Sequence, residues 1–89
     1  MNENDRQNEE TYRKNIIRLA LIEKLKSESK RYSKEKSKAE QLSLKLRELD
    51  ICASRARRTS MNAKVYRAWE EVRRIEFNIS TLEEEIKKY

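Results

Sequence analysis

Few residues of this 89-residue chain could carry out chemistry. It has no histidine, which is the commonest general base and metal ligand in proteins. The single cysteine, Cys52, has arginine neighbours, but it lies beside an apolar repeat, where cysteine usually acts as a small hydrophobic residue. No glycine-rich loop is present to hold a phosphate group. We therefore expect a protein that is not an enzyme, with no catalytic residue, metal site, cofactor or small-molecule substrate.

Basic residues form the second group of side chains that could take part in chemistry. The chain has a net charge of +6, and residues 53–74 alone have a net charge of +5. Helical hairpins can lay basic faces of this kind along RNA phosphates, although interleaved acidic residues and few aromatic residues count against it here. The predicted nucleic-acid contacts are Arg55, Arg57, Arg58, Lys64, Arg67, Arg73 and Arg74.

Composition restricts the elements that could position these residues. The chain contains no glycine and no proline, so turns that need a positive φ have no preferred residue. Charged residues make up 43% of the sequence and hydrophobic residues 36%, which is too little for a comfortable globular core at this length. Most residues are good helix formers. The composition therefore indicates an extended all-α protein.

Apolar residues repeat at alternating steps of three and four in both halves of the chain, as in a coiled coil. The C-terminal repeat consists of Val65, Ala68, Val72, Ile75, Ile79, Leu82, Ile86 and Tyr89. The N-terminal repeat consists of Tyr32, Glu35, Ala39, Leu42, Leu46, Leu49, Ala53 and Ala56. Extending the first repeat into the second half would place charged residues in its seam, so the register changes between Arg57 and Ser60.

A helical hairpin explains this change of register. If the two arms pair around Thr59, then Leu46 meets Val72 and Ala39 meets Ile79, so that small residues face large ones. The basic run over residues 30–38 would then lie beside the glutamates at 83–85, and Thr59 or Ser60 would cap the returning helix. The alternative is one continuous helix of about eighty residues in a parallel dimer, with a skip at the corner. We favour the hairpin.

The segment before the hairpin is apolar on almost every side. Residues 1–10 are acidic and predict a disordered tail, whereas residues 11–28 predict an apolar helical segment. This helix could fold back on the hairpin through the serine-rich stretch that follows it, lie on a membrane surface, or meet another chain. We favour the last of these, with an interface formed by Tyr12, Ile16, Leu19, Ile22 and Leu25.

The predicted fold class is therefore all-α: an antiparallel two-helix coiled-coil hairpin over residues 29–89, with its corner near 57–60 and a long N-terminal helical extension, assembled into a larger helical bundle. The predicted function is protein–protein interaction, as an adaptor, assembly chaperone or structural subunit, through self-association or a protein partner. The alternative is an RNA-binding helical hairpin. We expect no membrane insertion, and an intracellular, cytoplasmic location because of the single cysteine.

Overall fold

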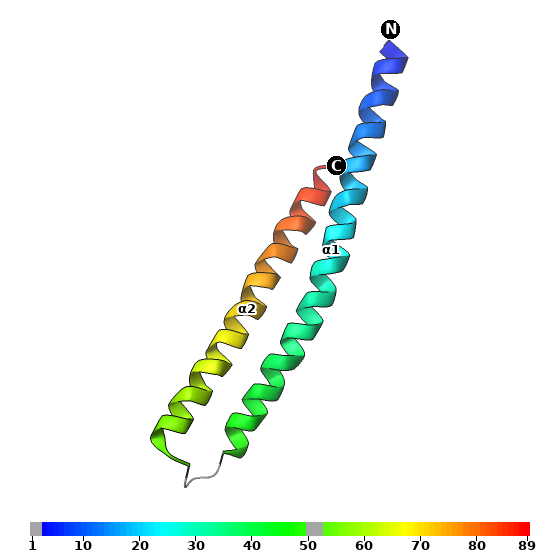
Figure 1. Ribbon diagram of the computed structural model, residues 1–89. Helices are drawn as coiled ribbons and strands as arrows, with labels where there is room; N and C mark the ends of the chain where they lie inside the picture. The colour runs from blue at the N-terminus through cyan, green and yellow to red at the C-terminus, as the bar shows by residue number, and fades with distance from the viewer. Residues whose placement is uncertain (1–2, 50–52) are drawn as a thin grey trace.

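The two apolar repeats form two helices that run antiparallel to each other (Figure 1). A computed structural model describes residues 3–49 and 53–89. Helix α1 spans Glu3–Glu48 and helix α2 spans Arg55–Lys87. With no glycine or proline in the chain, neither helix contains a residue that would interrupt it. The Cα atoms extend over 78 × 15 × 13 Å, so the molecule is a thin rod. The predicted all-α hairpin is confirmed.

A single seam of side chains holds the helices together. On α1 the seam includes Leu21, Leu25, Glu28, Tyr32, Glu35, Ala39, Leu42 and Leu46, all buried or half-buried, and Leu49 directly after the helix is half-buried too. On α2 it includes Met61, Val65, Ala68, Val72, Ile75, Ile79, Leu82 and Ile86, which are covered to a similar degree. The best-covered side chains are Ala39 and Ile75, at 0% exposure, and Val72, at 2%. The alternating steps of three and four therefore predicted the packed face of both helices correctly.

The corner lies earlier in the chain than predicted. Residues 57–60, where we expected the turn, belong to the first turns of α2. The N-cap of α2 is Ser54, whose Oγ accepts a hydrogen bond from the backbone N–H of Arg57 at 3.2 Å. This bond satisfies one of the N–H groups that a helix start leaves without a partner. The proposed caps Thr59 and Ser60 are helical instead, and the Thr59 hydroxyl donates to the Arg55 carbonyl oxygen.

Pairing between the helices shifts together with the corner. The Trp69 indole N–H donates to Ser43 Oγ at 2.9 Å, and these two residues are centred on position 56 of the sequence. The Tyr32 hydroxyl donates to Glu76 Oε1 at 3.1 Å, and this pair is centred on position 54. On the other flank the ion pair between Arg31 and Glu71 is centred on position 51, so the three contacts together place the centre near position 54. The expected centre at Thr59, with Leu46 opposite Val72, is therefore wrong by about five residues. A heptad repeat fits several registers equally well, so apolar spacing alone does not select among them.

The N-terminal part of α1 continues the same helix. The serine-rich stretch that could have served as a hinge lies inside α1, so this segment extends and does not fold back (Figure 1). Helix α1 begins at Glu3, so residues 3–10 of the predicted disordered tail are helical in this structure, and residues 1–2 lie outside the described residues. Alternating acidic, basic and amide side chains tolerate helical geometry well enough to continue a helix that is already nucleated. Because α2 covers α1 from Leu21 onward, the hairpin also begins earlier than the predicted residue 29.

Candidate functional site

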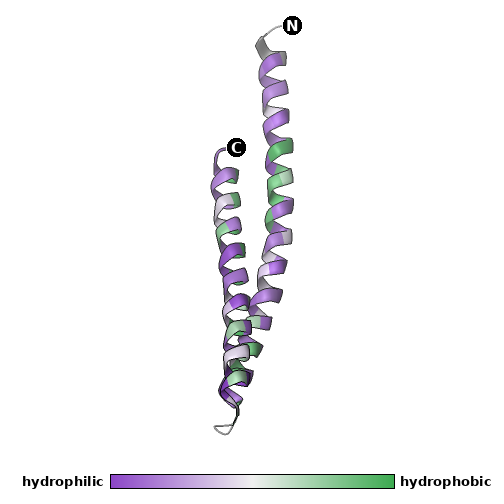
Figure 2. Cartoon of the chain, turned by 60° about the vertical axis from the view of Figure 1, so that its left-hand side comes forward, coloured by the Kyte–Doolittle hydropathy of each residue, from purple (hydrophilic) through white to green (hydrophobic). Residues whose placement is uncertain are grey.

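The first candidate site is the part of α1 that precedes Leu21, which we call the overhang (residues 3–20). Leu21 is the first side chain of α1 that is buried, and every described side chain before it is exposed. Four large apolar residues of the overhang are among these: Tyr12 is 67% exposed, Ile16 49%, Ile17 42% and Leu19 63%. In Figure 2 the apolar band of α1 lies near the C-terminal end of α2.

Most of these apolar residues share one face of the helix. Tyr12, Ile16 and Leu19 are spaced by four and three residues, so they form a stripe along α1. Leu21, which α2 covers, follows Tyr12 by nine residues, or two and a half helical turns. The stripe therefore lies on the back of α1, away from the seam. Nothing in the described part of the same chain can cover it without bending the helix.

The structure divides the predicted interface in two. Tyr12, Ile16 and Leu19 are exposed in the overhang, as an interface to another molecule requires. Ile22 and Leu25 are half-buried, so they are less open to another molecule than Tyr12, Ile16 and Leu19. Ile17 was absent from the predicted set although it is exposed. Its apolar side chain was visible in the sequence, but the stripe omits it because it lies nearer the seam side of α1.

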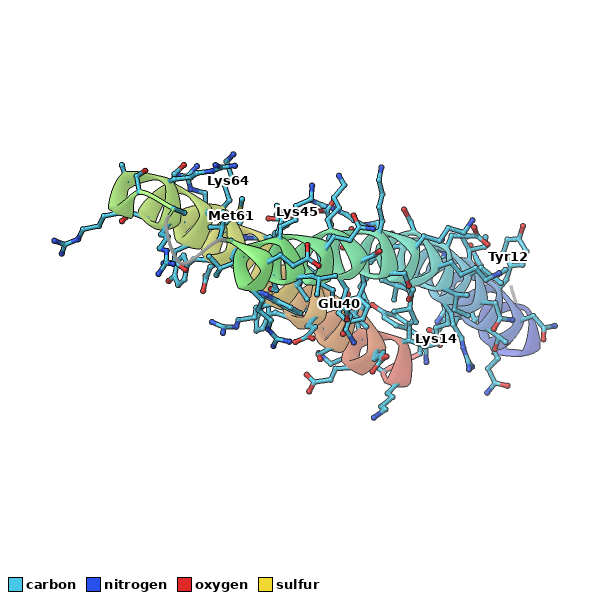
Figure 3. The ribbon with its side chains drawn as sticks, turned by 90° about the horizontal axis from the view of Figure 1, so that it is seen from below. Tyr12, Lys14, Glu40, Lys45, Met61 and Lys64 are labelled. Carbon is cyan, nitrogen blue, oxygen red and sulfur yellow. The ribbon has the colours of Figure 1, made fainter. Side chains whose placement is uncertain are left out.

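Charge is unevenly distributed along the overhang. Residues 11–22 contain three basic residues and no acidic residue, whereas residues 3–10 contain four acidic residues and one basic residue. Arg13 forms an ion pair with Glu9 at 2.9 Å, and both side chains are well exposed. In Figure 3 Tyr12 and Lys14 project on different sides of α1. Residues 11–22 therefore carry a net positive charge, although Arg13 is paired with Glu9 and Lys14 lies on a different side of α1 from Tyr12 (Figure 3).

The second candidate site lies near the corner, on one flank of the hairpin. Arg31 of α1 reaches Glu71 of α2 at 2.6 Å, and this ion pair identifies the two helix faces that meet on that flank. Lys38 and Lys64 lie one heptad nearer the corner than Arg31 and Glu71, respectively. Lys45 and Arg57 lie one further heptad toward the corner. We call these last four residues the basic flank. All four side chains are exposed, and Figure 3 shows Lys45 and Lys64 on the same side of the molecule.

The predicted nucleic-acid contacts fall into two groups. Arg73 pairs with Glu70 at 3.1 Å and Arg74 pairs with Glu71 at 3.5 Å, so the two arginines farthest from the corner are neutralised within the chain. The remaining five, Arg55, Arg57, Arg58, Lys64 and Arg67, are exposed on the first turns of α2, and Arg58 among them also has a partner within the chain. The residues predicted from the sequence did not include Lys38 and Lys45, which α1 contributes to the basic flank. The seven-residue spacing of Lys24, Arg31, Lys38 and Lys45 was the signal that could have found them.

The opposite flank is occupied by contacts within the chain. Trp69 donates to Ser43 there, and Lys36 Nζ lies 5.6 Å from the centre of the Tyr32 ring. The indole side chain is partly buried, so the most bulky aromatic residue of α2 supports the fold. This flank therefore has fewer side chains available to bind another molecule than the basic flank has.

Residues 3–49 and 53–89 contain no group of three or more side chains that could hold a metal ion. The same residues contain no helix with the length and apolar character needed to cross a membrane. Cys52 lies outside the described residues. Comparison with protein-family models, with curated proteins and with solved structures finds no significant match, so the function has to be argued from the two surfaces themselves.

Proposed function

We propose that this protein acts through protein–protein interaction, with the overhang as its docking segment. Its role would be that of an adaptor, assembly chaperone or structural subunit that joins a larger helical assembly. The observation that carries this proposal is the exposure of Tyr12, Ile16 and Leu19 on a helix face that α2 does not cover.

The energetics favour an external cover for this face. Burying an aliphatic side chain is worth roughly 1.5–3 kcal/mol, so Ile16 and Leu19 together forgo several kcal/mol while they remain in water. Isolated exposed leucines are ordinary, but neighbouring large apolar residues on one face are typical of interaction sites. The overhang also has no tertiary packing of its own, and a helix that lacks packing is only marginally stable in water. A partner would supply both burial and packing.

Charge indicates the kind of partner. Two copies of the overhang packed antiparallel around Ile16 would bring the basic segment 11–22 of one chain against the same segment of the other. Like charges at the edges of a helical interface are unfavourable, and a parallel arrangement has the same defect. A different helix with an apolar stripe and acidic edges avoids this repulsion. We therefore propose a partner helix of that chemistry as the occupant of the overhang.

Fluorescence-detected sedimentation in an extract of the producing cells tests the proposal. The labelled wild-type chain should sediment in a complex, whereas the Ile16→Glu/Leu19→Glu variant should sediment as the isolated chain, because two carboxylates on the stripe cannot be buried without a large penalty. The matched control is Leu44→Glu/Phe77→Glu, which adds the same charge at residues that are 54% and 72% exposed on the hairpin itself.

The control should sediment with the wild type, and circular dichroism should show that both variants keep the helical hairpin. A wild-type chain that sediments alone in the extract, or an overhang variant that stays in the complex, would contradict the proposal. Purified wild-type protein that dimerises through the overhang would contradict the acidic partner and favour self-association.

A further inference from the structure

The basic flank presents like charges to each other across the two helices. Arg31 and Glu71 form the cross-helix pair on this flank, and Glu71 also pairs with Arg74. One heptad nearer the corner the same two positions hold Lys38 and Lys64, and one heptad further they hold Lys45 and Arg57. The flank thus changes from attraction in its middle to repulsion near the corner.

The hairpin itself does little to neutralise this charge. Lys38 is paired with Glu35 at 3.7 Å in its own helix. Within residues 3–49 and 53–89, Lys45, Arg57 and Lys64 form no ion pair. The stretch 53–69 contains five basic residues and no acidic residue, and three of them, at 55, 57 and 58, lie where the helix dipole disfavours positive charge. This arrangement lowers the stability of the free hairpin, as binding surfaces often do.

We infer that the basic flank binds the phosphate backbone of double-stranded RNA. This inference is independent of the overhang and uses the other end of the rod. Each helix contributes two cations one heptad apart, which is a spacing of about 10 Å along its axis. The two rows lie side by side on helices whose axes are typically 8–10 Å apart. A double row of this kind can contact phosphates on both sides of a narrow groove.

The geometry favours duplex RNA over other polyanions. The major groove of A-form RNA is deep and narrow, so its two phosphate rows approach each other closely, whereas the major groove of B-form DNA is about 12 Å wide. Single strands are bound largely through aromatic stacking, but Trp69 lies on the opposite flank against Ser43. A membrane-surface helix would need a continuous apolar face beside the cations, and Leu44 next to Lys45 is a single exposed leucine that does not make one.

Salt-dependent binding of the full chain to an RNA duplex tests this inference. Four phosphate contacts predict a logarithmic slope of about −3.6, so the Kd should rise on the order of 150-fold between roughly 50 and 200 mM salt. The variant Lys45→Gln/Lys64→Gln loses two phosphate contacts, so its Kd should rise only about tenfold over the same range of salt concentration. The matched control Lys30→Gln/Lys34→Gln removes the same charge from exposed lysines outside the flank and should retain most of the wild-type slope.

Several results would overturn the inference. The first is that the flank variant has the same salt slope and Kd as the control variant. The others are that the wild-type chain binds a B-form DNA duplex, polyglutamate or anionic lipid vesicles as tightly as it binds the RNA duplex. Thermal melts should show that the flank variant is at least as stable as the wild type, since two mutually repelling charges are removed. The overhang variant Ile16→Glu/Leu19→Glu should keep the salt slope, so failure of this inference and failure of the proposed function are separable.

Discussion

Replacing Ile75 by alanine should unfold a large fraction of the hairpin. Ile75 is fully covered in the seam, and Tyr32 of the facing helix lies in this part of the hairpin, where its hydroxyl donates to Glu76. The substitution removes three carbon atoms from a fully covered site. At about 0.8 kcal/mol for each carbon, together with the cavity that remains, we expect a loss of about 3 kcal/mol. This loss corresponds to a change on the order of a hundredfold in the folding equilibrium.

Urea titration followed by helical circular dichroism measures this loss. A single seam supplies only a few kcal/mol of net stability in a chain of this size, so the midpoint should fall steeply. The control is Phe77→Ala, which removes a larger side chain that is 72% exposed and should change the stability by less than about 0.5 kcal/mol. A Phe77→Ala loss equal to that of Ile75→Ala would refute the assignment of the seam.

Three further substitutions follow from contacts in the hairpin. Glu28→Leu should raise the free energy of unfolding by about 1–3 kcal/mol in urea titration, because Oε2 of this seam carboxylate is buried with no hydrogen-bond partner. A lower free energy of unfolding would show that Oε2 has a hydrogen-bond partner in solution. Lys64→Glu should raise the free energy of unfolding by up to about 1 kcal/mol, because the new carboxylate faces Lys38, and it should also weaken RNA binding. Unchanged RNA affinity would contradict the role of Lys64 in the basic flank. Cysteines at Leu46 and Met61 should crosslink within one chain, as a centre near position 54 requires, and crosslinks only between chains would contradict the hairpin.

A second cysteine pair serves as the control for register. Leu46 and Val72 would face each other if the arms were centred on Thr59, so this pair should crosslink more slowly than Leu46 with Met61. Faster reaction of the Val72 pair would restore the register that the sequence predicted.

The sequence contained enough information to predict the helices and their packed faces. Apolar spacing reports which side of a helix is buried, and Ala39, Val72 and Ile75 were all in the predicted repeats. It did not locate the corner, because without glycine or proline the start of α2 depends on one serine cap, and Ser54 has close competitors in Thr59 and Ser60. The hydrogen bond between Trp69 and Ser43 links residues 26 positions apart, which heptad spacing does not reveal.

The two candidate surfaces were predictable to different degrees. Tyr12, Ile16 and Leu19 were identified because large apolar residues outside the seam of a short hairpin have little to cover them. Ile22 and Leu25 are more covered than expected because the length of the overhang depends on the corner, and an earlier corner allows α2 to reach further along α1. The basic flank was only half found, since its partner row on α1 becomes apparent once the Arg31–Glu71 pair fixes which faces meet.

Site-specific photocrosslinking from the overhang tests the central claim most directly. A photoreactive residue at Leu19, in the cells that produce the protein, should form an adduct with a different polypeptide whose crosslinked segment is an acidic-edged helix. The same residue placed at Phe77, which is equally open but lies on the hairpin, should form no such adduct. Equal adducts from both positions, an adduct only within the same chain, or no adduct from Leu19 would contradict the account of the overhang as a docking segment.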